Sequence, residues 1–208
     1  MTNNANAIGI DVGGVGKGFH AVALHDGAFE PYSSTSIEEL GIWCRARAPL
    51  VVAIDAPCKW SNGKQPSRLA ERQLAIGGKT IQCFRTPTRE SATPKPFYGW
   101  VFNGEELYEE FNPDFMLFDG TRRDGRVVIE TFPHAIMCAL AGRLVSARPK
   151  VARRREMLRN LGYNDRVLAN IDFVDAALCA ITAERFLLGR TISFGDADEG
   201  LIVVPRSN

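Results

Sequence analysis

Short apolar segments recur along the chain, and their spacing predicts alternating strands and helices. Apolar side chains occupy alternate positions in residues 7–12, 19–25 and 28–33, which is typical of an antiparallel meander. The β-branched runs 50–55 and 126–131 predict two further strands, buried on both faces. Segments with helical spacing predict six helices, over residues 36–47, 68–76, 103–111, 134–144, 150–161 and 172–188.

The order of these elements predicts the fold. A three-stranded meander followed by alternating helices and strands is the order of a ribonuclease H-like α/β fold. Such a fold has a mixed five-stranded sheet in the order 3-2-1-4-5, with helices on both faces. We expect residues 1–208 to form one such domain. The segment at about 58–100 is rich in Pro, Gly, Lys and Arg and is expected to be an insertion after the fourth strand. Residues 201–205 predict a terminal strand or an extended tail.

Acidic residues stand at the ends of three predicted strands and on the last predicted helix. Asp11, Asp55 and Glu130 each follow an apolar run, and the carboxyl ends of neighbouring parallel strands meet at one edge of a sheet. Asp172 and Asp175 are three residues apart and share one helix face. Crowded carboxylates repel by roughly 4 kcal/mol per pair at about 4 Å and an effective dielectric of about 20. Because a divalent cation removes this repulsion, the five acids predict a metal site for Mg²⁺ or Mn²⁺.

Each of these acids also has an ordinary structural explanation when it is taken alone. Asp11 and Asp55 could cap the turns that follow their strands. Asp172 could cap the last helix, and Asp175 would suit its first turn. Glu130 forms such turns poorly and needs a cation, either an arginine or a metal. No single structural explanation covers all five positions, and this favours the metal site.

Composition excludes several classes of protein. The 208 residues are 45% hydrophobic and 24% charged, which is typical of a soluble globular protein. No apolar stretch approaches the roughly 20 residues of a membrane helix. The first six residues lack the basic start and the apolar core of a signal peptide. Five scattered cysteines without a C-x-x-C pair predict reduced thiols, so we expect a cytoplasmic protein.

The net charge is only +1, but basic residues are concentrated in segments 59–89 and 143–166. Such segregation suits phosphate binding, although solvated Arg-rich helix faces would give the same pattern. We expect nucleic acid, DNA or RNA, as the substrate, and a homodimer is left open. The predicted substrate-binding residues are Lys17, Arg68, Arg85, Arg89, Arg153 and Arg154.

Five motifs occur in a fixed order along the chain. They are GIDVGG at 9–14, AIDAP at 53–57, IETFP at 129–133, DFVDAA at 172–177 and EGLIVVP at 199–205. Together they resemble an uncharacterised prokaryotic family, a domain of unknown function regarded as ribonuclease H-like nucleases. The resemblance covers nearly the whole chain. The last helix is also similar to that of Holliday-junction resolvases with the same fold.

The resemblance implies that Asp11, Asp55 and the Asp172/Asp175 pair match the metal-binding carboxylates of that superfamily. Ribonuclease H itself takes a glutamate from its first helix, and this chain has only poor matches at the exposed start of that helix. Glu130 is an addition peculiar to this group.

Our leading prediction is a nuclease that hydrolyses phosphodiester bonds with two metal ions. Asp11 would bridge the metals, flanked by Asp55 and by Asp175 or Asp172, and Asp11, Asp55 and Asp175 would be catalytic. One alternative is a nucleotide- or phosphometabolite-binding enzyme of the actin-like kinase branch, which shares the opening motif but needs two such domains. The other is a catalytically silent nucleic-acid-binding module whose acids pair with arginines.

Overall fold

A computed structural model describes residues 7–14, 16–93, 95–121 and 125–207. The six N-terminal residues, in which no signal peptide is expected, lie outside this part of the chain. The strands are β1 (Ala7–Val12), β2 (Phe19–His25), β3 (Ala28–Ser34), β4 (Val51–Asp55), β5 (Ala75–Ile76), β6 (Lys79–Thr80), β7 (Met116–Leu117), β8 (Val127–Glu130), β9 (Thr191–Asp196) and β10 (Gly200–Pro205). The helices are α1 (Ile37–Ala46), α2 (Leu69–Gln73), α3 (Arg89–Ala92), the 3₁₀ turn η1 (Pro96–Tyr98), α4 (Gly99–Phe111), α5 (Pro133–Leu140), α6 (Lys150–Asn160) and α7 (Ile171–Leu187).

The main sheet has the ribonuclease H-like arrangement that the order of elements predicts. Strands β1, β2 and β3 form an antiparallel meander, and β1, β4 and β8 are parallel neighbours. The order β3-β2-β1-β4-β8 confirms the predicted order 3-2-1-4-5. The predicted total of five strands is wrong, because the described sheet has eight. Strands β10 and β9 extend it beyond β8, and the short β7 also pairs with β8.

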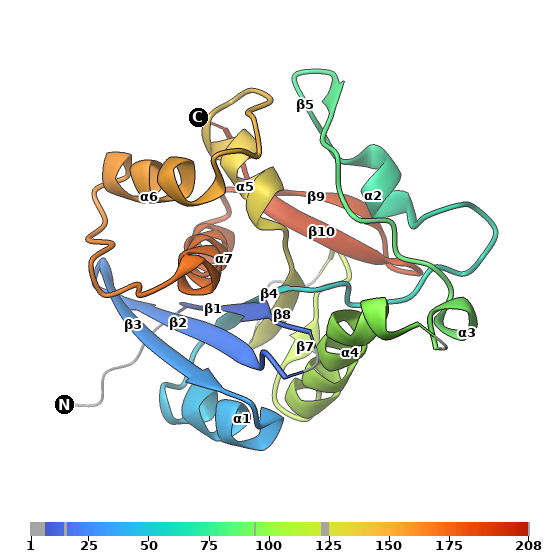
Figure 1. Ribbon diagram of the computed structural model, residues 1–208, viewed down its shortest axis with the longest axis horizontal. Helices are drawn as coiled ribbons and strands as arrows, with labels where there is room; N and C mark the ends of the chain where they lie inside the picture. Colours follow the sequence, from blue (N-terminus) through green and yellow to red (C-terminus); the bar gives the residue numbers. More distant parts are fainter. Residues whose placement is uncertain (1–6, 15, 94, 122–124, 208) are drawn as a thin grey trace.

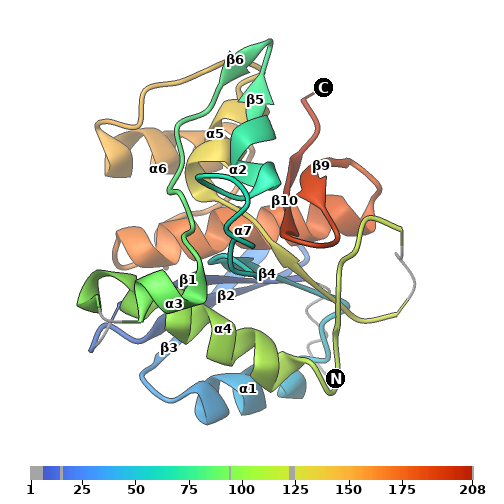
Figure 2. The ribbon, with the colours of Figure 1, turned by 90° about the vertical axis from the view of Figure 1, so that its right-hand side faces the viewer.

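Helices cover both faces of the sheet. The helices α5, α6 and α7 lie on one face, and α1 and α4 lie on the other (Figures 1 and 2). Successive side chains of a strand point to opposite faces, so each strand contributes to two cores. In β4, Val51 and Ala53 pack in the core beneath α7, while Val52 and Ile54 pack in the core beneath α1 and α4. Among the described helices, none has the length and apolar character needed to cross a bilayer.

Helix α7 approaches β1 so closely that only glycine fits between them. A Cβ atom at Gly9 would lie 2.0 Å from the carbonyl oxygen of Ala176 and 2.1 Å from the amide nitrogen of Ala180. The backbones therefore touch directly, as glycine permits. The first turns of α7 consequently lie over the carboxyl end of β1, where the Gly9-x-Asp11 motif places its acid.

The starts of two helices near Asp11 differ from the predictions. Helix α4 begins at Gly99, four residues before the predicted start, and the side chain of Asn103 donates to the carbonyl of Gly13 at 2.8 Å. The cap of α7 is Asn170, whose side chain accepts from the amide of Phe173 at 3.0 Å. Asp172 is therefore not needed as a cap.

Two other helices are shorter than predicted. Helix α5 ends at Leu140, four residues before the predicted end at 144. Helix α2 ends at Gln73, because residues 75–80 fold back as the β5–β6 hairpin. Apolar spacing continues beyond both helix ends, so it does not predict where either helix stops.

Candidate metal centre

Strand register places three polar side chains side by side at the carboxyl end of β1. Asp11 pairs with Asp55 of β4 on one side and with His20 of β2 on the other. Directly paired residues on adjacent strands point to the same face. This is the face that α7 covers, so the three side chains point toward the first turns of that helix.

Asp172 of α7 completes a compact group of possible metal ligands. Asp11, His20 and Asp172 each offer one ligand atom, and these atoms lie within 4.8 Å of one another. The start of α7 also orients the imidazole of His20. Its Nε2 lies 3.4 Å from the side-chain amide of Asn170, and its ring meets the ring of Phe173 edge-on at 4.7 Å.

The carboxylates at this site lack ion-pair partners among the described residues. Within the described residues, no arginine, lysine or histidine forms an ion pair with Asp11, Asp55 or Asp172. Burial, followed by the negative charges of Asp175 and Asp172, raises the pKa of Asp11 to about 7. Burial and the charges of Asp11 and Asp175 raise the pKa of Asp55 well above its ordinary value. A divalent cation would remove this repulsion, as expected for a metal-binding site.

Asp175 lies beside this group but already has protein cations as partners. Its side chain is 1% exposed, and its carboxylate forms ion pairs with Arg154 and with Lys150, the latter at 2.7 Å. Both cations come from the first turns of α6, one helical turn apart. The same two charges act on Asp11 and Asp55 and lower their pKa values, opposing the effect of burial.

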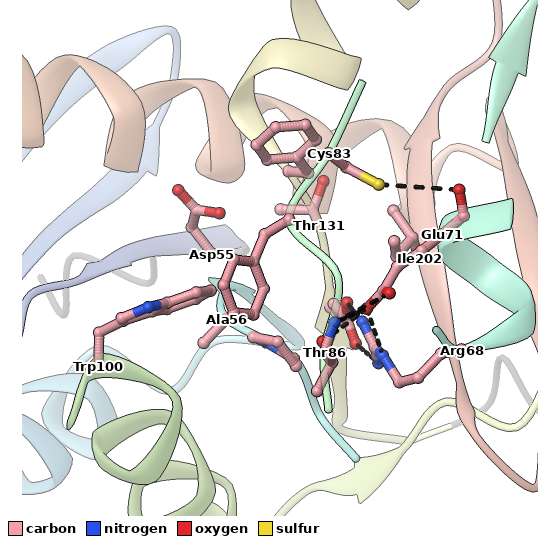
Figure 3. A pocket seen from close by; sticks show the side chains of 13 residues that line it. Asp55, Ala56, Arg68, Glu71, Cys83, Thr86, Trp100, Thr131 and Ile202 are labelled. Atoms are coloured by element: carbon pink, nitrogen blue, oxygen red, sulfur yellow. Dashed lines mark hydrogen bonds and ion pairs between the residues drawn. The ribbon is translucent and has the colours of Figure 1, made fainter. Parts of the chain in front are cut away.

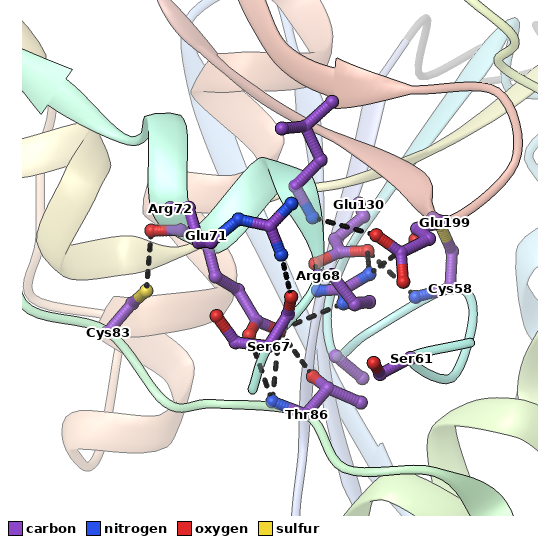
Figure 4. A network of polar contacts seen from close by, with 12 residues as sticks. Cys58, Ser61, Ser67, Arg68, Glu71, Arg72, Cys83, Thr86, Glu130 and Glu199 are labelled. Carbon is purple, nitrogen blue, oxygen red and sulfur yellow. Dashed lines mark hydrogen bonds and ion pairs between the residues drawn. The ribbon is translucent and has the colours of Figure 1, made fainter. Parts of the chain in front are cut away.

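The structure does not support the prediction that Glu130 binds a metal. Register pairs Glu130 with Ile54, so its side chain points to the sheet face opposite Asp55. Both of its oxygens accept from the guanidinium of Arg68, at 2.5 and 2.8 Å, and one also accepts from the amide of Cys58. Figure 4 shows this network, in which Glu71 accepts from the same guanidinium at 2.8 Å. The sequence predicted that Glu130 would pair with either an arginine or a metal, and in the structure its partner is the arginine Arg68.

The predicted substrate-binding residues fall into two groups. Arg68 and Arg154, which were predicted to bind the substrate, are buried in ion pairs with acids of the chain and so are not free to contact a phosphate. The other predicted cations are exposed: Lys17, Arg85, Arg89 and Arg153. Lys17 lines the same cleft as the metal-ligand group, whereas Arg89 forms an ion pair with Glu105.

An aromatic pocket adjoins the acidic cleft. Trp100 at the start of α4 lines both, and the ring of Phe84 meets it edge-on at 4.9 Å. Figure 3 shows Trp100 and Asp55 on one side of this pocket and Arg68 on the other. Residues between 68 and 86, from the segment predicted to be an insertion, contribute much of its wall.

His20 is a candidate metal ligand that the sequence patterns do not reveal. The histidines of this chain have no metal-ligand spacing along the sequence, and only the register of the meander brings His20 opposite Asp11. The pairing of Val12 with Phe19 places His20 opposite Asp11. This register depends on how many residues the glycine-rich turn contains, so it could be found from sequence only by assuming that strand pairing begins at Val12 and Phe19.

The raised pKa of Asp11 predicts a pH-dependent stability. The carboxyl group titrates at 3.8 in the unfolded chain and at about 7 in the folded one. Between these two pKa values the folded state therefore holds a proton that the unfolded state has lost. The folded state is destabilised as a result: this loss of stability is absent below the lower pKa, grows as pH rises, and is complete above the higher one. Measured in EDTA, the Tm of Asp11→Asn should exceed that of the wild type by a few degrees at about pH 8 and by much less at about pH 5. An equal difference at both pH values would contradict the unbalanced site.

Residues 9–200 match a family described as "Protein of unknown function (DUF429)". No curated protein matches the chain. Among solved structures, the RuvC structure from Thermus thermophilus is 17% identical and has a TM-score of 0.38, with 88% of this chain and 94% of that chain covered. Because the family match spans nearly the whole sequence, the chain belongs to the DUF429 family.

Proposed function

We propose that this protein is a metal-dependent nuclease that hydrolyses phosphodiester bonds in nucleic acid. The observation that carries the proposal is the group formed by Asp11, His20 and Asp172, whose carboxylates form no ion pair with a cation of the described chain. It stands beside Asp55 at the carboxyl edge of the parallel strands, the usual place for chemistry in an open α/β sheet.

The donor set fits a divalent cation. Two carboxylates and one imidazole are ordinary metal ligands, and Asp11, Asp172 and His20 would hold the ion. The imidazole favours Mn²⁺ over Mg²⁺, because Mg²⁺ prefers oxygen ligands in a strict octahedron. When bound, the ion would supply charge stabilisation to the phosphate and lower the pKa of a water molecule.

The chain's own residues then have defined roles in hydrolysis. A water oxygen attacks phosphorus, and the bond between phosphorus and one ester oxygen breaks. A carboxylate oxygen of Asp55, which adjoins Asp11 in register, accepts the proton of the attacking water. The departing ester oxygen takes a proton from solvent. The products are an alcohol and a phosphate monoester, so atoms and charges balance.

Features around the acids support a nucleic-acid substrate. The exposed Lys17 lines the acidic cleft. The side chain of Lys150, which pairs with Asp175, is about half exposed. Cations at these positions would contact phosphate oxygens. The rings of Trp100 and Phe84 in the adjoining pocket offer surfaces on which an unpaired base stacks.

A cleavage assay tests this proposal. Single-stranded, double-stranded and branched DNA and RNA are incubated with Mn²⁺, with Mg²⁺ or with EDTA. We expect cleavage of at least one substrate, faster with Mn²⁺ than with Mg²⁺ and absent in EDTA. Binding without cleavage of any substrate would contradict a nuclease and favour the silent binding module. Cleavage that persists in EDTA would contradict the metal site.

A further inference from the structure

The ion pairs of Asp175 separate the site into two halves of different chemistry. On one side of Asp11, the carboxylates of Asp11 and Asp172 form no ion pair with a cation of the described residues, although the exposed Lys17 lines the same cleft. On the other side, Asp175 is held by Lys150 and Arg154. The second half is therefore already neutralised by the chain itself.

Helix α6 is anchored so that these two cations stay in place. Leu158 is buried in the core beneath the helix. Arg155 donates to the carbonyl of Asp165 at 2.9 Å and to that of Leu168, both in the loop that precedes α7. Figure 1 shows α6 beside α7, with its first turn near α5. Residues 150 and 154 are one turn apart, so both side chains face the same carboxylate.

We propose that the site binds one divalent cation, and that Lys150 takes the place of a second one by contacting the phosphate of the substrate. This inference rests on the proposed nuclease function. It revises the expectation that Asp175 belongs to a two-metal site.

Lys150 and Arg154 differ in burial, and this difference indicates different roles. The side chain of Arg154 is 8% exposed, so it serves as a positioning residue that neutralises Asp175. The side chain of Lys150 is 47% exposed, so its ammonium reaches solvent and can meet a substrate oxygen while it stays beside Asp175. A lysine in this position would offset charge on the phosphate in the transition state.

The number of bound metal ions tests the inference without any cleavage assay. Bound Mn²⁺ is counted by electron paramagnetic resonance during titration of the full chain. We expect one Mn²⁺ per wild-type chain and two per chain of Lys150→Met/Arg154→Met, because Asp175 then faces Asp11 and Asp55 without a counter-charge. Adding Asp175→Asn to the double variant should return the number to one.

A single variant covers the case in which the double variant does not fold, since Arg154 is buried. Lys150→Met should lower cleavage by about 10²-fold and leave the first Mn²⁺ bound. Lys150→Arg should retain more activity than Lys150→Met, because it keeps the positive charge.

The outcomes separate this inference from the proposed function. Two Mn²⁺ per wild-type chain, or one in a folded double variant, would overturn the inference and leave the nuclease proposal standing. Full activity of Lys150→Met would also overturn it. A wild type that binds no Mn²⁺ would contradict the metal site, and the inference with it.

Discussion

Asp11→Asn should reduce metal-dependent cleavage by about 10³-fold or more while leaving the fold intact. Asp11 lies beside Asp55 in the sheet and beside His20 and Asp172 in the ligand group. Its carboxylate is therefore needed for metal binding and for positioning the metal next to Asp55. The amide keeps the shape of the side chain but removes the charge that would bind the ion. The measurement is kcat/KM with Mn²⁺ on the best substrate of the wild type.

The stability of the same variant distinguishes a chemical effect from misfolding. Because Asn removes a carboxylate that its neighbours repel, Asp11→Asn should unfold at the same or a higher temperature than the wild type in EDTA. Asp198→Asn is the matched control, since Asp198 is exposed in the β9–β10 turn. The control should cleave like the wild type. Undiminished cleavage by Asp11→Asn would exclude the proposed site, and a lowered Tm would show that its loss of activity is not specific.

Arg68→Met should lower the free energy of unfolding by about 3–5 kcal/mol, the usual cost of breaking a buried ion pair. Arg68 is 1% exposed and donates to the carboxylates of both Glu130 and Glu71. Its loss leaves two buried carboxylates without their cation. For a chain of this size the Tm should fall by roughly 10 °C. Urea unfolding followed by circular dichroism measures the change.

Two further variants show whether burial causes this effect. Arg89→Met breaks the exposed pair with Glu105 and should change the free energy of unfolding far less than Arg68→Met does, because solvent screens this pair. Adding Glu130→Met to Arg68→Met removes the orphaned carboxylate and should recover part of the loss. Equal costs for Arg68→Met and Arg89→Met would contradict the structural role of Arg68, as would a double variant less stable than Arg68→Met.

This network also shows why the role of Glu130 could not be predicted correctly from sequence. The run of residues 127–130 predicts a buried strand ending in an acid, as do the runs before Asp11 and Asp55. A side-chain period of two means that a shift of one residue reverses the face. The register places Asp55 opposite Thr131 rather than Glu130, so Glu130 faces the other core. Nothing local in the sequence distinguishes these registers.

The sequence by itself determined the order of the central strands and the presence of acids at the carboxyl ends of β1 and β4. Period-two runs, β-branched runs and helix spacing are local signals, and they specified five strands and the main helices. They also placed Asp172 and Asp175 on one helix, because residues three apart share a face.

Only the tertiary structure decided which acids remain available to bind a metal and which side chains lie beside them. The contact between Gly9 and α7 brings Asp172 to Asp11, and the packing of α6 brings Lys150 and Arg154 to Asp175. Strand pairing adds His20. These residues lie far apart in the chain, and whether a carboxylate meets a cation depends on side-chain geometry that local patterns do not specify. For this reason the sequence predicted a cluster of five acids, whereas the structure divides them. Asp11 and Asp172 belong to the open ligand group and Asp55 lies beside it, while Asp175 and Glu130 are held in ion pairs.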